Sequence, residues 1–200
     1  MHIGDGILSA PVLISGAALA AAGTVVGLAK MRNEDIPRVG ILSATFFVIS
    51  LINIPVGPTC VHLVGSGLAG LILGWRAFPA ILVALTLQAV FFQFGGLTTL
   101  GVNTFCMAAP AVAMGLLFGP MIRRNNGSPV VAVFFTGALA ILMGSILVAI
   151  ALVASSQDYT VLAGWELLAH CVLMVVEGVF CVVCVEFLRK VKPEILRFEQ

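Results

Sequence analysis

The sequence predicts an all-α integral membrane protein with seven transmembrane helices. Of its 200 residues, 60% are apolar and only 10% are charged, and the mean hydropathy is +1.16. A soluble domain carries about 25% charged residues. The apolar residues gather into runs close to the ~20 residues that a helix needs to cross a bilayer. A net charge of +1 gives no reason to expect a nucleic-acid partner. The expected partner of this surface is the lipid bilayer.

Seven apolar stretches follow one another, each bounded by residues that favour turns. They are expected at residues 9–29, 39–54, 61–75, 79–94, 104–122, 129–154 and 163–188. The segments between them are, in order, KMRNEDIPR, PVGPT, RAFP, FGGLTTLGVN, RRNNGSP and SSQDYT. In the first stretch, Gly16, Ala20 and Gly23 form a row of small residues, which favours packing on another helix of the same chain. The third and fourth stretches are short and Gly-rich or flanked by Pro, so we expect them to be tilted, or broken and partly re-entrant.

The positive charges predict how the chain is oriented in the membrane. With seven spans, all ten Lys and Arg fall on one side. Cytoplasmic loops carry the excess of Lys and Arg, so this side is expected to be cytoplasmic. We therefore expect residues 1–200 to form one transmembrane domain, with residues 1–8 extracytoplasmic and residues 189–200 a cytoplasmic tail. The ten cations are Lys30, Arg32, Arg38, Arg76, Arg123, Arg124, Arg189, Lys190, Lys192 and Arg197.

Two histidines are expected on the outer side, and their chemistry suits a metal ion. The α-amine of Met1, the backbone amide of His2 and the Nδ1 atom of its imidazole can close a five-membered and a six-membered chelate ring. One further nitrogen, from His62, would complete a square-planar set of four, which suits Ni²⁺ or Cu²⁺. The amine and the amide must lose protons to bind, so the affinity should rise with pH. The alternative is that an outward-facing histidine here is only a surface side chain.

Four segments, spread over nearly the whole chain, carry recognisable motifs. They are MHIGDGILS, INIPVGPTCVHLVGSGLAG, FFQFGGLTTLGVNTFCMA and AHCVLMVVEG. In this combination they resemble the CbiM/NikM family, the metal-binding membrane subunits of energy-coupling-factor (ECF) transporters for cobalt and nickel. The resemblance implies the six-helix substrate-binding module of these transporters with one extra N-terminal helix. It also implies that Met1, His2 and His62 bind the metal.

The same resemblance implies a function and partners. The bound substrate would be Ni²⁺ or Co²⁺, with both metals open at this point, and imported cobalt would serve cobalamin biosynthesis. The chain would be the substrate-specific subunit of an ABC importer. Its partners would be a transmembrane coupling subunit, ABC ATPase subunits and, in some systems, a small accessory membrane subunit. The sequence has no G-x-x-x-x-G-K-[ST] phosphate loop, so the chain is not expected to hydrolyse ATP itself.

Polar residues near the expected site can orient its ligands. Asp5 is expected to cap the first helix or to brace a loop rather than to bind metal, with Ser9 as the other capping choice. Cys60 is expected to fill space, with a soft metal ligand as the alternative. His170 and Glu177 lie seven residues apart on one helix face, which favours a structural or vestibule pair. The polar candidates are Asp5, Asn53, Thr59, Cys60, Ser66, Gln93, Asn103, His170 and Glu177.

Two other functions compete with metal capture. An intramembrane metalloenzyme or hydrolase would need a nucleophile with a base, or an open metal position with a general base nearby. The sequence has neither H-E-x-x-H nor G-x-S-x-G. A soft-metal channel is suggested by the 7 Met and 5 Cys, but they are scattered along the chain, and a channel needs weak sites rather than a chelate. The sequence therefore favours a metal-capture subunit that is not an enzyme.

Overall fold

The computed structural model describes residues 2–56, 59–124 and 129–196, and it describes only the backbone at residues 53–56, 59–61 and 124. These parts of the chain form seven α-helices, a two-stranded hairpin and four short 3-10 turns. The helices are α1 (Ala10–Ala29), α2 (Ile36–Ile49), α3 (Ser66–Leu73), α4 (Ala77–Phe92), α5 (Leu100–Arg124), α6 (Val130–Ser155) and α7 (Thr160–Val191). The strands are β1 (Asn53–Val56) and β2 (Thr59–His62), and the turns are η1 (Asn33–Asp35), η2 (Gly74–Arg76), η3 (Gln157–Tyr159) and η4 (Pro193–Leu196).

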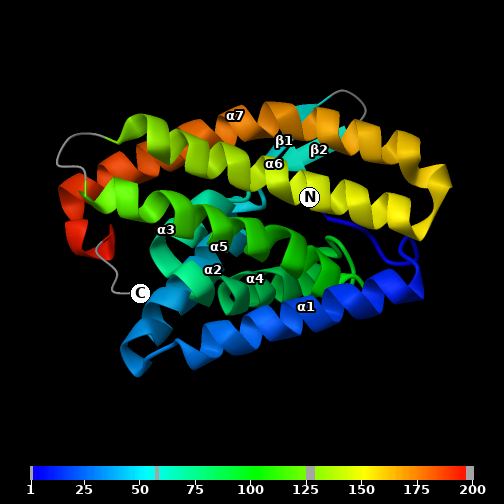
Figure 1. The fold of residues 1–200 in the computed structure, drawn as a ribbon, viewed down its shortest axis with the longest axis horizontal. Helices are drawn as coiled ribbons and strands as arrows, with labels where there is room; N and C mark the ends of the chain where they lie inside the picture. The colour runs from blue at the N-terminus through cyan, green and yellow to red at the C-terminus, as the bar shows by residue number, and fades with distance from the viewer. Residues whose placement is uncertain (1, 57–58, 125–128, 197–200) are drawn as a thin grey trace.

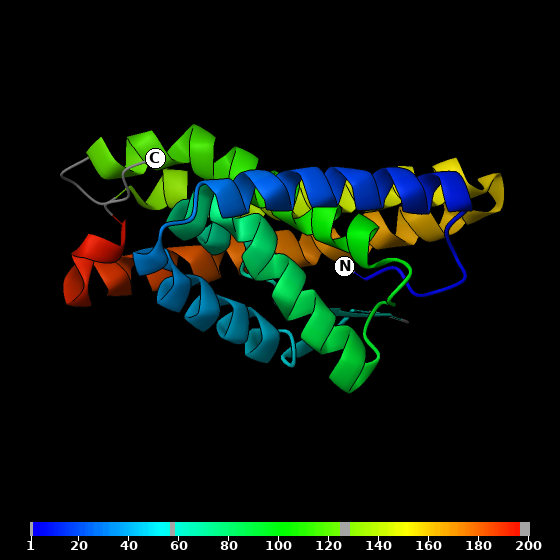
Figure 2. The ribbon, with the colours of Figure 1, turned by 90° about the horizontal axis from the view of Figure 1, so that it is seen from below.

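The long helices lie roughly along one direction. α6 and α7 run side by side on one flank, and α1 lies along the opposite flank (Figure 1). α3, α4 and α5 lie between these flanks and supply most of the buried apolar side chains. Figure 2 shows α2 and α4 inclined to the long helices, with the hairpin close to the N-terminal segment. The termini of several elements therefore meet near the start of the chain.

The hairpin corrects the expected helix boundaries. The second stretch was expected to be helical to residue 54 and the third from residue 61, but α2 ends at Ile49 and α3 begins at Ser66. Between them the strands pair antiparallel, with Asn53 opposite His62. The segment NIPVGPTCVH is rich in β-branched residues, which favour strands, and its two prolines cannot continue a helix. Hydropathy alone does not separate such a segment from a buried helix.

Within the described residues, five helical segments are long and apolar enough to cross a membrane. They are Ala10–Ala29, Ser66–Phe92, Leu100–Arg123, Val130–Ser155 and Gln157–Val191. The helix α2, with 14 residues, is shorter than the ~20 residues of a full span. The third expected stretch, residues 61–75, is helical over only 8 residues, because α3 ends at Leu73 and is followed by Gly74, whose φ is +53°. α3 and α4 together make up the single candidate span Ser66–Phe92. Large apolar side chains such as Ile14 and Val161 point outwards on α1 and α7, as in a multi-pass membrane protein.

Small residues let the central helices approach closely. A Cβ atom on Gly70 of α3 would lie 1.7 Å from the backbone oxygen of Ala111 in α5. On α1, the row formed by Gly16, Ala20 and Gly23 is buried, and a Cβ added at either glycine of this row would collide with side chains of α5 or α4. The prediction that this row packs within the chain is confirmed.

The basic segments gather at one end of the molecule. The C-terminal ends of α1, α5 and α7 lie there together with the N-terminal ends of α2 and α6 (Figure 1). Arg76, between α3 and α4, pairs with Asp35 at 2.9 Å and donates its Nε–H to the backbone oxygen of Lys30 at 3.1 Å. This pair ties the turn after α3 to the loop after α1. The arrangement agrees with cations on one side of the membrane.

Candidate metal centre

The structure brings the two expected histidines together. His2 lies in the extended segment before α1, and His62 is the last residue of β2. The Nδ1 atom of His2 lies 2.8 Å from the Nε2 atom of His62, although the residues are 60 positions apart in the sequence. The ring centroids are 4.6 Å apart. His62 is buried, with 7% of its surface exposed, and His2 is partly buried.

The hydrogen-bond partners of each ring favour one tautomer. The Nε2 atom of His2 lies 2.6 Å from the side-chain oxygen of Gln88 in α4, so Nε2–H donates and Nδ1 keeps its lone pair. The Nδ1 atom of His62 lies 2.9 Å from the backbone oxygen of Leu63, so Nδ1–H donates and Nε2 keeps its lone pair. Two nitrogen lone pairs therefore face each other at 2.8 Å. Such an arrangement needs a proton or a cation between them.

Burial disfavours a proton in this position. It lowers the pKa of His62 to about 3. It also lowers the pKa of His2 well below its usual value, and the charge of His62 adds to the effect. A buried imidazole loses the hydration of its charged form, whereas a metal ion bonds directly to the lone pair. At neutral pH both rings are therefore neutral and free to act as ligands.

The N-terminal segment is held in place by α5 and the loop before it. The backbone N–H of Ile3 donates to the side-chain oxygen of Asn103 at 3.0 Å, and the side-chain amide of Asn103 donates to the oxygen of Ile3 at 3.0 Å. The hydroxyl of Thr99 donates to the same oxygen at 2.8 Å. Asn103 is 2% exposed and Thr99 is fully buried. Both backbone groups of Ile3, the residue after His2, are therefore hydrogen-bonded by side chains, much as a neighbouring β-strand would bond them.

Asp5 braces a loop, which is one of its two expected roles. Its carboxylate accepts a hydrogen bond from the backbone N–H of Thr98 at 3.0 Å and another from the Thr98 hydroxyl. A Cβ on Gly96 would lie 2.0 Å from the Asp5 carboxylate, so the loop can lie against the N-terminal segment only because this residue is glycine. Asp5 does not cap the first helix. The N-cap position of α1 is Ser9, the other expected capping residue, although its side chain makes no cap hydrogen bond.

Gln88 is the glutamine of α4 that contacts a histidine. Gln93 was the glutamine expected near the site, but it is exposed at the end of α4, with φ of +56°, and makes no described hydrogen bond to either ring. Gln88 is 2% exposed and lies inside an otherwise apolar helix. A polar residue at membrane depth is a functional candidate by default, so the signal for Gln88 was present in the sequence.

His170 and Glu177 do not form the expected pair. Seven residues along a helix correspond to about 10 Å, which is too far for direct contact. His170 contacts Glu166 instead, one turn away, with 3.2 Å between its Nδ1 atom and the carboxylate. The carboxylate of Glu177 accepts hydrogen bonds from the backbone N–H groups of Val64 and Gly65.

The remaining candidates are placed only in part. Ser66 is buried, and its hydroxyl has no hydrogen-bond partner among the described residues. Met1 lies outside the part of the chain that the structure describes, as do the side chains of Asn53, Thr59 and Cys60. Within the described ranges, no group of three or more His, Cys, Asp or Glu could hold a metal ion. A metal at the histidine pair would therefore take its other ligands from backbone nitrogens or from residues outside those ranges.

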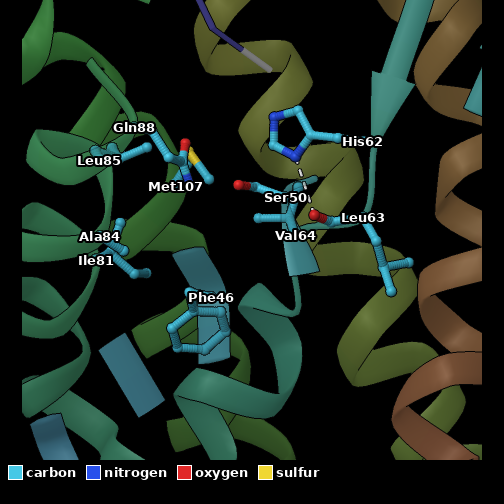
Figure 3. A pocket seen from close by; sticks show the side chains of 10 residues that line it. All are labelled: Phe46, Ser50, His62, Leu63, Val64, Ile81, Ala84, Leu85, Gln88 and Met107. Carbon is cyan, nitrogen blue, oxygen red and sulfur yellow. Dashed lines mark hydrogen bonds between the residues drawn. The ribbon is translucent and has the colours of Figure 1, made fainter. Parts of the chain in front are cut away.

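A small cavity lies beside the histidine pair. It has a volume of about 10 Å³, room for about one water molecule. In Figure 3, His62 faces Gln88 and Met107 across it, and Phe46 lies at its other end. The dashed line in the figure marks the contact of His62 with Leu63. His62 therefore has little free space on this side.

Comparisons with known proteins agree with this picture. Residues 2–195 match the family model described as "Cobalt uptake substrate-specific transmembrane region". A protein of Haemophilus influenzae named for metal transport is 36% identical, with 98% of this chain and 97% of that protein covered. A protein of Archaeoglobus fulgidus named for fused nickel transport, NikMN, is 30% identical over 98% of this chain and 68% of its own.

The fold is also found among solved structures. A truncated transition metal transporter superposes with a TM-score of 0.78 and 25% identity, over 95% of this chain and 99% of the other. The relatives are named as transport proteins, which favours transport over the enzyme alternative. The chain belongs to the CbiM family, and it is a substrate-specific membrane component of cobalt or nickel transport rather than an enzyme.

Proposed function

We propose that the chain captures Ni²⁺ or Co²⁺ at the outer face of the inner membrane, as the substrate-specific subunit of an ECF-type ABC importer. The observation that carries the proposal is the 2.8 Å separation between the Nδ1 atom of His2 and the Nε2 atom of His62. Two nitrogens that each lie about 2.0 Å from one metal ion, at a right angle, are about 2.8 Å apart, whereas a tetrahedral angle would separate them by about 3.3 Å. The observed separation therefore suits neighbouring corners of a square plane.

The other two corners belong to the start of the chain. The backbone nitrogen of His2 and the amine of Met1 reach the same ion through the five-membered and six-membered chelate rings. The ligand set is then the Met1 amine, the His2 amide, the Nδ1 atom of His2 and the Nε2 atom of His62. Gln88 supports this set because its contact with the Nε2 atom of His2 leaves Nδ1 free to bind the metal. Four nitrogens in a plane favour Ni²⁺ on ligand-field grounds.

The proposed topology has seven segments, with the N-terminus outside and the C-terminus in the cytoplasm. α2 is about 21 Å long, short of a bilayer core of about 30 Å, and the hairpin extends it towards the outer face. α3 then leads back to Arg76 at the basic end. The ion pair between Arg76 and Asp35 supports placing both loops on the cytoplasmic side. Residues 1–8 then form the extracytoplasmic metal-binding segment, and residues 189–200 form a cytoplasmic tail.

Transport across the membrane requires partners. The chain has no phosphate loop of its own, so ABC ATPase subunits would supply the energy and a transmembrane coupling subunit would transmit it. A small accessory membrane subunit completes the proposed assembly. The chain's own contribution is to bind and shield the ion, because His62 and Gln88 are buried and the first residues close over them.

The test is metal binding by the full chain purified in detergent. A Gly-Pro extension before Met1 moves the amine out of the chelate. It offers no amine–amide–imidazole chelate of its own, because proline has no backbone N–H to lose. His2→Ala removes the imidazole. Both variants should lose stoichiometric Ni²⁺ and Co²⁺ binding in isothermal titration. Gly-Pro added after Gln200 is the matched control and should bind like the unmodified chain. If stoichiometric binding survives the N-terminal extension, the proposed ligand set is wrong.

A further inference from the structure

Glu177 is a buried carboxylate that holds the backbone next to His62. It lies in the middle of α7 and has no exposed surface. Its side chain accepts hydrogen bonds from the backbone N–H of Val64 and from that of Gly65, the latter at 2.9 and 3.0 Å to its two oxygens. These N–H groups follow His62 by two and three residues. A side chain of the last long helix therefore fixes the segment that carries a proposed metal ligand.

The geometry of this contact calls for a carboxylate. Gly65 has a φ of +71° and is the N-cap of α3, so the N–H groups before the helix converge on one point. One carboxylate oxygen accepts from both N–H groups, and the other accepts from Gly65 as well. Because both oxygens face the Gly65 N–H, the NH₂ group of a glutamine would face that N–H in either orientation. The positive end of the α3 dipole adds to the attraction. The ion pairs found among the described residues do not include Glu177, so these amides are its main partners.

The two histidines are held from different helices. On one side, Asn103 of α5 pairs with the backbone of Ile3, next to His2, and Gln88 of α4 holds the ring. On the other side, Glu177 of α7 holds the backbone beyond His62. α7 cannot slide freely, because it packs tightly on α6: a Cβ on Gly137 would lie 2.6 Å from the backbone oxygen of Glu177.

We propose that Glu177 is the positioning residue for His62: its bond to the Val64–Gly65 backbone holds the Nε2 atom of His62 where it completes the four-nitrogen set. This inference rests on the proposed function. When the bond is broken, the chelate of Met1 and His2 stays intact while the fourth nitrogen is lost or exchanged for water. The role is thus distinct from that of a residue that merely supports the fold.

The test uses the visible absorption of Ni²⁺ bound to the full chain in detergent. In Glu177→Gln the band should move to longer wavelength, because the oxygen of water is a weaker-field ligand than an imidazole nitrogen. The affinity should fall about 10–100-fold, as is typical when a partner of a metal ligand is lost. His62→Ala, which removes the fourth nitrogen directly, should show the same band. Glu186→Gln, the same change on the same helix near its cytoplasmic end, is the matched control and should keep the original band.

Each outcome separates this inference from the proposed function. If His62→Ala shifts the band but Glu177→Gln keeps both the original band and the original affinity, Glu177 does not position His62. If His62→Ala leaves the band unchanged, the proposed ligand set itself fails. If Glu177→Gln does not give a folded protein, the absorption and affinity of Glu177→Asp are measured instead. This variant keeps the charge but withdraws the carboxylate by one methylene group, so it should show the same band shift. Unchanged absorption and affinity in Glu177→Asp would also overturn the inference.

Discussion

Replacing Asn103 by leucine tests whether the N-terminal segment must be pinned for metal to bind. Asn103 both accepts from the N–H of Ile3 and donates to its oxygen, at 3.0 Å each. Leucine has a similar volume, so α5 should still pack, but Ile3 loses both contacts. The oxygen of Ile3 keeps its bond from Thr99. The N–H of Ile3 is left buried without its acceptor, because Ile3 itself is only 4% exposed.

The expected loss follows from this unsatisfied group. A buried donor without a partner costs about 1–3 kcal/mol. This cost falls only on the state in which the N-terminal segment is inserted, and that is the state that binds metal. At 1.4 kcal/mol for each tenfold change, the apparent affinity should fall by about 5–150-fold. Thr99→Val removes only one of two bonds to the oxygen of Ile3, so its loss should be smaller, about 5-fold.

The measurement is competitive Ni²⁺ titration of the purified variants against a chelator of known affinity. Gln93→Leu is the control, because Gln93 is exposed and makes no described hydrogen bond to either histidine. The expected order of loss is Asn103→Leu, then Thr99→Val, then the control. An affinity of Asn103→Leu within a factor of two of the unmodified chain would refute the idea that this pairing positions the metal ligands.

Three further predictions concern stability, each measured by thermal unfolding in detergent without metal. The pKa of His62 is lowered to about 3 in the folded chain, and that of His2 is also lowered. Below about pH 6.5 the unfolded chain therefore binds more protons than the folded chain, so the free energy of unfolding is highest above this pH and falls as the pH drops towards 3. His62→Ala should flatten this pH dependence. Gly70→Ala should destabilise the fold by about 1–3 kcal/mol, because the added Cβ would lie 1.7 Å from the backbone oxygen of Ala111. Gly40→Ala should be neutral or slightly stabilising, because nothing lies within 4 Å of the added Cβ. Equal stability of the two variants would contradict this packing. In the Asp35–Arg76 pair, Asp35 is buried and Arg76 is partly buried. Replacing only one partner should cost about 1–3 kcal/mol, and replacing both partners should cost less than the sum; additive losses would mean that the pair does not interact.

The order of the helices could be predicted from the sequence because it depends on local properties. Apolar runs and turn segments alternate in the same order as the helices. The hairpin around Asn53 and His62 could not be predicted with the same rules, since an apolar β-branched run has the same hydropathy in a strand and in a helix. The pairing of its strands depends on contacts with the N-terminal segment and α7, which local composition does not encode.

The histidine pair could be predicted from the sequence for a different reason. His2 and His62 were the only histidines expected outside, so topology alone reduced the choice to two. The partners of these ligands were harder to predict. Asn103 was among the candidates, but its partner is the backbone of Ile3, and that of Glu177 is the backbone of Val64 and Gly65. Almost every residue carries the same backbone N–H and C=O groups, so the sequence does not indicate which of them a side chain will hydrogen-bond.

These backbone partners have a consequence for release of the ion. The separation of 2.8 Å between His2 and His62 depends on how α7 packs relative to α4 and α5, because each ligand is fixed to a different side. Metal–nitrogen bonds tolerate changes of only about 0.2 Å. A shift of about 1 Å between the two sides would therefore break the bond to His62, while the chelate at the start of the chain stayed intact. If the metal is bound as proposed, a partner subunit can weaken the site by a small movement of α7, without first unfolding the N-terminal segment.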